Sequence, residues 1–284
     1  MAGYLRETDP LLFVAGLAVM VIQALLATWR WNLVLHYKRI SIGFGKLLRF
    51  LWLGLFFNQI LPSTVGGDAV RGYSLVREGC SLGSASVAVL VDRLMGVSGL
   101  VLLVTFTFPL SFKYLPPGGA RSGVLAVVAC ALTGLVLLIL LDRVSTRFLQ
   151  WRLARGLTAM SREARHLLFG KGPGLQVLVL SLVIQLLSVV AIAILALAAQ
   201  INVAIDALIL VLPVATLLMT IPISVAGWGV REGIMVVGLG YASVSPERAL
   251  ALSVLYGILL LVVALPGGLA WFIDGWWRGN CERG

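Results

Sequence analysis

Two arginines carry the most informative chemistry in this sequence, because each one closes a motif rich in helix-breaking residues. Arg71 ends the stretch Leu61-Pro-Ser-Thr-Val-Gly-Gly-Asp-Ala-Val-Arg71, and Arg231 ends Ile221-Pro-Ile-Ser-Val-Ala-Gly-Trp-Gly-Val-Arg231, 160 residues later (231 − 71). Five of the eleven aligned positions are identical: Pro62/Pro222, Val65/Val225, Gly67/Gly227, Val70/Val230 and Arg71/Arg231. A guanidinium offers five N–H donors in a planar fork, and a helix that starts at a break exposes backbone N–H groups. Together these groups suit a phosphate or another anion.

The same arginines also have a structural interpretation, in which each pairs with a carboxylate. Arg71 would pair with Asp68, and Arg231 with Glu232 or with a carboxylate across the repeat. The two interpretations are compatible, because the arginine of an empty anion site can rest on a carboxylate. We favour contact with substrate, since two broken segments at corresponding places in two halves are typical of transporter binding sites.

A further charged pair, Asp92-Arg93, is embedded in the apolar run from Ser84 to Phe112. A charge at membrane depth costs roughly 2.5–3.5 kcal/mol on insertion scales, so some compensation is required. Adjacent residues on a helix point about 100° apart, which predicts different partners for the two side chains. Asp92 would balance Arg71 or relay protons, and both the structural and the functional interpretation stay open.

The remaining candidates surround the two breaks. Asn58 and Ser63 flank the first break and would satisfy backbone groups that it frees. Trp228 at the second break would be a packing plug or a contact for a lipid chain. The residues predicted to bind substrate are therefore Asn58, Ser63, Gly66, Gly67, Asp68, Arg71, Asp92, Arg93, Gly227, Trp228, Arg231 and Glu232.

No catalytic or metal-binding pattern accompanies these residues. The three cysteines have no metal-ligand spacing, and the two histidines, His36 and His166, stand apart in basic stretches. The sequence contains no nucleophile–base pair, Walker loop or dinucleotide fingerprint. We therefore predict no enzymatic activity, no cofactor and no metal.

Composition places the motifs in a membrane. Of the 284 residues, 60% are hydrophobic and 12% are charged, with a mean hydropathy of +1.02, whereas a soluble domain carries about 25% charged residues. The net charge of +10 gathers in two basic stretches, 30–49 and 143–171. Such stretches between apolar spans mark the cytoplasmic side, so we expect membrane lipids as partners and no nucleic acid. The run from Leu11 to Thr28 lacks a preceding basic region and is predicted to be a retained span.

The apolar runs predict an all-α membrane protein with long spans and two broken segments. Spans are expected at 11–35, 84–112, 123–141, 174–199 and 248–273, an amphipathic surface helix within 143–171, and broken segments at 50–79 and 205–241. The first broken segment has only about twelve apolar residues before its break, too few to cross a hydrocarbon core of about 30 Å, and is predicted to re-enter. A short helix is expected after it, with Asp68 as its N-cap.

Charge placement sets the predicted topology of one transmembrane domain over residues 1–284. Repeat A covers 11–112, the linking span 123–141 and basic helix 143–171 follow, and repeat B covers 173–273. Each half is a span, a re-entrant hairpin and a span, and a single linking crossing inverts the second half. The hairpins would meet near the midplane of the cell membrane, with the N-terminus outside and the C-terminus in the cytoplasm.

The motifs together resemble those of a known family. The patterns Asn58…Leu61-Pro-Ser…Gly66-Gly-Asp68…Arg71, Asp92-Arg93, and Pro222…Gly227-Trp-Gly-Val-Arg-Glu232 are similar to those of the lysylphosphatidylglycerol synthase transmembrane region, a flippase-like domain. The resemblance covers nearly the whole chain. It implies an α-helical domain that moves a phospholipid or an isoprenoid-linked lipid between leaflets. Fused family members carry a soluble transferase domain, and their synthase activity is not carried over to this chain.

The leading hypothesis is a lipid translocase that holds an anionic headgroup between the hairpin tips with Arg71 and Arg231. Asp68, Asp92 and Glu232 would balance the arginines when the site is empty. Two alternatives stay open: a membrane partner that presents lipid to a separate transferase, and an integral-membrane enzyme that acts on a lipid headgroup. A modified lipid that co-purifies with the protein would indicate the enzyme.

Overall fold

The computed structural model describes residues 8–61, 65–143, 152–170, 172–220 and 227–281, and these residues form helices joined by short connections. Within them, five helical stretches are long and apolar enough to cross a membrane: Pro10–Tyr37, Leu82–Tyr114, Gly119–Leu140, Gly174–Ala198 and Pro246–Ile273. These stretches coincide with the predicted spans to within a few residues at most of their ends. The all-α class and the multi-pass membrane character are therefore confirmed.

The first half of the chain consists of a long helix, a helical hairpin and a second long helix. In chain order these are α2 (Pro10–Tyr37), α3 (Phe44–Ile60), α4 (Val65–Arg77) and α5 (Leu82–Thr107). The start of α2 is sharply defined, because Asp9 accepts a hydrogen bond from the backbone N–H of Leu11 at 2.8 Å and a proline follows Asp9. The hairpin forms because α3 and α4 pack side by side.

The first basic stretch differs from its prediction. Arg30 lies inside α2 and is buried, and Lys46 and Arg49 lie inside α3, so only Lys38 and Arg39 of this group stand outside the helices. The helix before the break is longer than its apolar run of about twelve residues, since α3 has 17 residues, or roughly 25 Å of helix. Long basic side chains reach from a helix end back to water, so they do not mark where a helix begins.

The two glycines of the first motif also have a different role from the one expected. Because α4 begins at Val65, Gly66 and Gly67 lie inside its first turn, and Asp68 is a first-turn residue rather than the N-cap. A Cβ atom on Gly67 would stand 2.1 Å from the carbonyl oxygen of Gly54 in α3. The glycine therefore allows the two helices of the hairpin to touch, and it does not interrupt α4.

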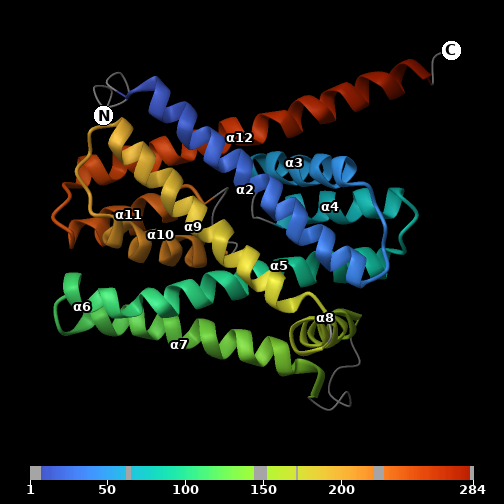
Figure 1. Cartoon of the computed structure of the whole chain (residues 1–284), viewed down its shortest axis with the longest axis horizontal. Helices are drawn as coiled ribbons and strands as arrows, with labels where there is room; N and C mark the ends of the chain where they lie inside the picture. Colours follow the sequence, from blue (N-terminus) through green and yellow to red (C-terminus); the bar gives the residue numbers. More distant parts are fainter. Residues whose placement is uncertain (1–7, 62–64, 144–151, 171, 221–226, 282–284) are drawn as a thin grey trace.

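The connection between the halves consists of η1 (Phe108–Leu110), α6 (Ser111–Tyr114), α7 (Gly119–Leu140), η2 (Leu141–Arg143) and α8 (Arg152–Phe169). Met160, Ala164 and Leu167 of α8 are buried where that helix packs against α5 and α7. Figure 1 shows α8 end-on while α5 and α7 lie in the plane of the view. An amphipathic helix that runs across the spans has the orientation of a helix at the membrane surface.

The second half repeats the order of the first. It contains α9 (Gly174–Ala198), α10 (Ile205–Met219), α11 (Val230–Gly240) and α12 (Pro246–Cys281), and α10 packs on α11 as a second hairpin. The start of α10 is tied to α6, because the Asp206 carboxylate accepts hydrogen bonds from Lys113 and from the Tyr114 hydroxyl. The Lys113 ammonium beside Asp206 holds the pKa of that carboxyl below its usual value. The C-terminal part of α12 extends past the other helices (Figure 1).

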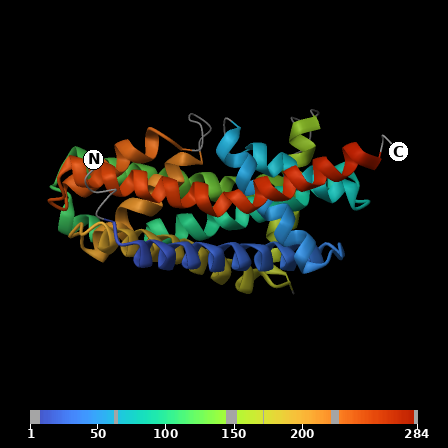
Figure 2. The ribbon, with the colours of Figure 1, turned by 90° about the horizontal axis from the view of Figure 1, so that it is seen from above.

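Helix contacts in one half reappear in the other when α2–α5 are exchanged for α9–α12. α3 packs on α12 as α10 packs on α5, α5 packs on α9 as α12 packs on α2, and α2 packs on α3 as α9 packs on α10. α2 and α9 pack on each other, and this contact stays the same when the two helices are exchanged. Figures 1 and 2 place the α3/α4 hairpin toward one end of the long axis and the α10/α11 hairpin toward the other.

Candidate functional site: two arginine clusters

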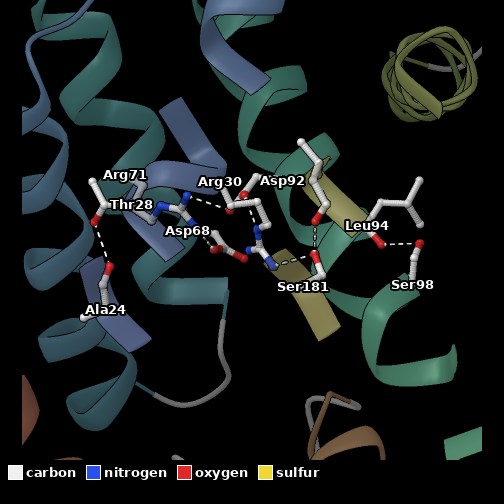
Figure 3. A network of polar contacts seen from close by, with 10 residues as sticks. Ala24, Thr28, Arg30, Asp68, Arg71, Asp92, Leu94, Ser98 and Ser181 are labelled. Atoms are coloured by element: carbon white, nitrogen blue, oxygen red, sulfur yellow. Dashed lines mark hydrogen bonds and ion pairs between the residues drawn. The ribbon is translucent and has the colours of Figure 1, made fainter. Parts of the chain in front are cut away.

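Arg71 belongs to a group of ion pairs that joins α2, α4 and α5. We call Arg30, Asp68, Arg71, Asp92 and Arg93 the first arginine cluster. The Asp92 carboxylate, 1% exposed, accepts from Nε of Arg30 at 3.0 Å and from Nη2 of Arg71 at 2.8 Å (Figure 3). Asp68 accepts from Nε of Arg93 at 2.8 Å and lies 3.7 Å from Nη1 of Arg71. Both carboxylates expected to balance Arg71 are thus beside it, and Asp92 and Arg93 do pair with different partners.

The first arginine cluster has more positive than negative charge. Three guanidinium groups face two carboxylates, which leaves one positive charge (3 − 2) among these side chains. Arg71 is 8% exposed, and its Nε has no hydrogen-bond partner in the described part of the chain. Its guanidinium carbon lies 3.9 Å from the centroid of the Trp31 ring, a cation–π contact. Arg71 therefore keeps a donor that the carboxylates of the cluster do not use.

Arg30 was not among the residues predicted to bind substrate. From the sequence it belongs to the basic stretch 30–49, which is predicted to lie between apolar spans on the cytoplasmic side. In the structure Trp31 is fully buried, and Nη1 of Arg30 donates to Oγ of Ser181 in α9 at 3.1 Å. A signal was available in the sequence, since the apolar run continues past Arg30 to Leu35 and keeps the arginine inside the helix.

Small residues make room for the guanidinium groups. A Cβ atom on Gly54 would stand 2.9 Å from Cγ of Arg71, and one on Gly96 would stand 3.0 Å from Nη1 of Arg30. Asn58 accepts a hydrogen bond from the backbone N–H of Gly67 at 2.9 Å, which is the role expected for it near the break. Ser63, the remaining candidate at this break, lies outside the described residues.

Arg231 belongs to a different group, contributed by α11, α12 and the residues just before α11. We call Trp228, Arg231, Glu232, Ser253 and Tyr256 the second arginine cluster. Arg231 is 1% exposed; its Nη2 lies 2.7 Å from the Glu232 carboxylate, and its Nε lies 3.2 Å from Oγ of Ser253. Its guanidinium carbon is 4.9 Å from the Trp228 ring and 5.9 Å from the Tyr256 ring.

The acidic residue in the first turn of α11 satisfies one backbone group at the start of that helix. The Glu232 carboxylate accepts from the backbone N–H of Gly229 at 2.6 Å, which is the N3 half of a capping box, and glycine has no side chain to supply the other half. Gly227 and Gly229 have φ of 79° and 84°, left-handed conformations that favour glycine. A Cβ atom on Gly257 would stand 2.4 Å from Nη2 of Arg231, so this arginine also packs against a glycine.

The two clusters occupy corresponding places in the two halves. Ser253 follows Asp92 by 161 residues, the same offset that separates Gly257 from Gly96 (257 − 96). The contacts described for Arg71 and for Arg231 have no residue in common, so each arginine is held within its own half. In the part of the chain that the structure describes, no three acidic, histidine or cysteine side chains lie together as a metal site. Each cluster is centred on a buried guanidinium group, a side chain that pairs well with anions.

A multi-pass helical protein with two hairpins and buried arginines is the class that the fold and the clusters define. The chain belongs to the family described as the lysylphosphatidylglycerol synthase TM region, whose profile matches residues 2–268. It is 27% identical over 278 residues to a UPF0104 membrane protein of Methanothermobacter thermautotrophicus, covering 88% of this chain and 81% of that protein. A UPF0104 membrane protein of Pyrococcus horikoshii is 26% identical over 108 residues, or 37% of this chain and 32% of that protein. No solved structure matches the chain. The resemblance predicted from the motifs is confirmed, and a lipid-related role in the membrane is consistent with it.

Proposed function

We propose that this protein is a lipid translocase that moves an anionic phospholipid or an isoprenoid-linked lipid between leaflets of the cell membrane. The phosphate of the headgroup is bound at the hairpins, chiefly by the first arginine cluster, with Arg231 on the opposite hairpin as a second contact. The lipid chains stay in the surrounding bilayer. The N-terminus faces outside and the C-terminus faces the cytoplasm.

The observation that carries the proposal is the buried guanidinium of Arg71, whose Nε has no hydrogen-bond partner in the described part of the chain. A buried donor without a partner is unfavourable, and at membrane depth no water is present to satisfy it. Asp92 already accepts from both Arg30 and Arg71, and Asp68 pairs with Arg93 and lies near Arg71. An anionic headgroup would accept from the unused Nε of Arg71.

The arrangement of helices supports a transport mechanism. The exchange of contacts between α2–α5 and α9–α12 is what an inverted repeat would produce, and the hairpins lie toward opposite ends of the long axis. Re-entry of each hairpin from its own side of the membrane, and rocking of one repeat against the other, are parts of this proposal. Movement of α4 or α11 would carry its arginine with it.

The test is leaflet scrambling of fluorescent phosphatidylglycerol in proteoliposomes. Wild type is compared with Arg71→Gln, Arg71→Lys and Arg231→Gln, and with Arg248→Gln as a control at an exposed arginine of α12. We expect wild-type and control activity to be equal and Arg71→Gln to be at the rate of empty liposomes. Arg71→Lys keeps the charge and loses the fork, so it separates folding from function: a folded, inactive Arg71→Lys variant supports the site. Wild-type scrambling no faster than empty liposomes would overturn the proposal.

The family's description favours a second candidate. A transmembrane region of a synthase works beside an enzyme that modifies lipid, so the chain would act as a partner that presents lipid to a separate transferase. This candidate predicts that phosphatidylglycerol binds at the first arginine cluster and that purified protein does not scramble it. Binding without scrambling would therefore select the partner role over translocation.

A further inference from the structure

A cavity of about 500 Å³ lies between α7, the helix that links the two halves, and the second hairpin. Three helices contribute most of its walls: Val124 and Val127 come from α7, Leu210 and Val214 from α10, and Ile234 from α11. No residue of either arginine cluster lines it. The cavity is therefore a different place in the fold from the site proposed for the headgroup.

The cavity is long and narrow, and it runs along α10. Ala207 near the start of that helix and Leu218 near its end both line the cavity. Eleven residues separate the two (218 − 207), a helical rise of roughly 16 Å. Spread over that length, the volume gives a mean cross-section of roughly 30 Å². A slot of these proportions accommodates one extended hydrocarbon chain that lies along the helix.

The lining is almost entirely apolar. Among the residues that the structure describes, its only polar side chains are the phenol groups of Tyr114 and Tyr241. A buried water needs about two to four polar partners, so this cavity is a poor site for water. Protein interiors also contain few voids larger than a water molecule, which argues against an empty cavity of this size. At membrane depth, the material available to fill it is the hydrocarbon of the bilayer.

The cavity has an open side and a polar end. On the side of α11, the lining residue Val237 is 63% exposed, so the cavity communicates with the surroundings of the helices. At the outer end of the second hairpin, Tyr241 is 41% exposed and the Tyr114 hydroxyl donates to the Asp206 carboxylate. Tyrosine favours the membrane–water interface. The polar end is thus the place for a headgroup, and the apolar slot continues from it toward the break.

We propose that this cavity binds one hydrocarbon chain of a membrane lipid, whose headgroup lies at the outer end of the second hairpin near Tyr114 and Tyr241. The chain lies along α10, between α7 and α11, and contacts the side chains of Leu210 and Val214. No charged side chain belongs to the described lining, so the site binds a lipid by its chain and does not select among headgroups. It goes beyond translocation and does not depend on it.

The test is photo-crosslinking with phosphatidylcholine that carries a diazirine in the middle of one acyl chain. The full chain is reconstituted in liposomes that contain this lipid, and mass spectrometry maps the adducts after illumination. Leu210 and Val214 are 5% and 9% exposed, so a lipid chain reaches them only inside the cavity. We expect adducts at these two residues, and equal yields when phosphatidylglycerol carries the diazirine instead.

Two variants fill the cavity from different walls. A Cβ atom at the lining residues Gly123 of α7 or Gly233 of α11 meets no atom within 4 Å, so a leucine at either position extends into open space. We expect Gly123→Leu and Gly233→Leu each to reduce the adducts at Leu210 and Val214 by about tenfold, because a lipid chain beside the added side chain would overpack the cavity.

The matched control is Gly134→Leu. Gly134 also lies in α7 and has open space at its Cβ position, but it does not line the cavity, so the adducts should be unchanged. Arg71→Gln should leave them unchanged as well, even where it abolishes scrambling, which separates failure of this site from failure of translocation. Thermal unfolding in detergent checks that each variant is folded.

Four results would overturn the proposal. They are the absence of adducts at Leu210 and Val214 in the parent, adducts that persist in the folded Gly123→Leu or Gly233→Leu variant, an equal loss in Gly134→Leu, and adducts confined to phosphatidylglycerol. The last result would assign the cavity to a headgroup-selective site. Each filled variant is sufficient by itself, because the two leucines enter from separate helices.

Discussion

The two arginine clusters have the same arrangement of helices around the central arginine, and they differ in how the charge of that arginine is balanced. In each, an arginine on the second helix of a hairpin packs against a glycine and faces the long helix that follows. Arg71 finds its counter-charge on α5, at Asp92, and shares it with Arg30 of α2. Arg231 finds its counter-charge on the adjacent residue, Glu232, and meets a neutral Ser253 where the first half has Asp92.

The comparison indicates which of the two arginines could bind the anion of a ligand. The second cluster is balanced, one arginine to one glutamate, and Glu232 also caps α11, so it acts mainly as a local anchor. The first cluster joins three helices, contains three arginines to two aspartates and retains an unused donor on Arg71. A ligand anion would therefore act more strongly on the first half than on the second.

The largest expected effect is on stability, at the position where the halves differ in charge. Asp92→Asn leaves Arg30 without its carboxylate and leaves Arg71 with only Asp68 at 3.7 Å, and it should cost about 3–5 kcal/mol. Ser253→Ala removes one hydroxyl at the corresponding position and should cost about 1 kcal/mol. Thermal unfolding in detergent compares the two variants. Equal losses of stability in the two variants would mean that the two clusters do not differ in their dependence on a buried counter-charge.

The next effect concerns the close approach of α3 and α4. Gly67→Ala drives a Cβ atom toward the Gly54 carbonyl oxygen, and backbone atoms yield little, so we expect a loss of about 1–3 kcal/mol. Gly72→Ala is the matched control on the same helix, because no atom lies within 4 Å of a Cβ there; it should be neutral or gain up to about 1 kcal/mol. Thermal unfolding measures both, and a harmless Gly67→Ala would contradict the packing.

The smallest effect is at the outer end of the second hairpin, where Asp206 is held by Lys113 and Tyr114. Its pKa is lowered in the folded protein, so the contact stabilises the protein above the unfolded pKa of about 3.9 and is lost as the pH falls through the folded pKa. Asp206→Asn should cost at most about 1 kcal/mol at neutral pH, because the pair is largely exposed. The difference from wild type should close in acid. A difference that persists there would exclude the ion pair as its cause.

Much of the architecture could be predicted from the sequence, because long apolar runs and paired breaks depend on local pattern. The spans, the hairpins and the contacts of Arg71 with Asp68 and Asp92 were accessible in this way. The buried position of Arg30 could not be predicted, because burial of an arginine depends on which helices pack over it, here α5 and α9. The role of Gly67 depends in the same way on the α3 backbone facing it.

The most direct test of the account is headgroup selectivity, the ratio of scrambling rates for phosphatidylglycerol and phosphatidylcholine in the same proteoliposomes. Arg71→Gln reduces the first cluster to two arginines and two aspartates, whereas Arg231→Gln leaves it unchanged. We predict a wild-type preference for phosphatidylglycerol of about tenfold or more, abolished by Arg71→Gln and retained by whatever activity Arg231→Gln keeps. Selectivity that survives Arg71→Gln, or that Arg231→Gln removes to the same extent, would contradict the assignment of anion binding to the first arginine cluster.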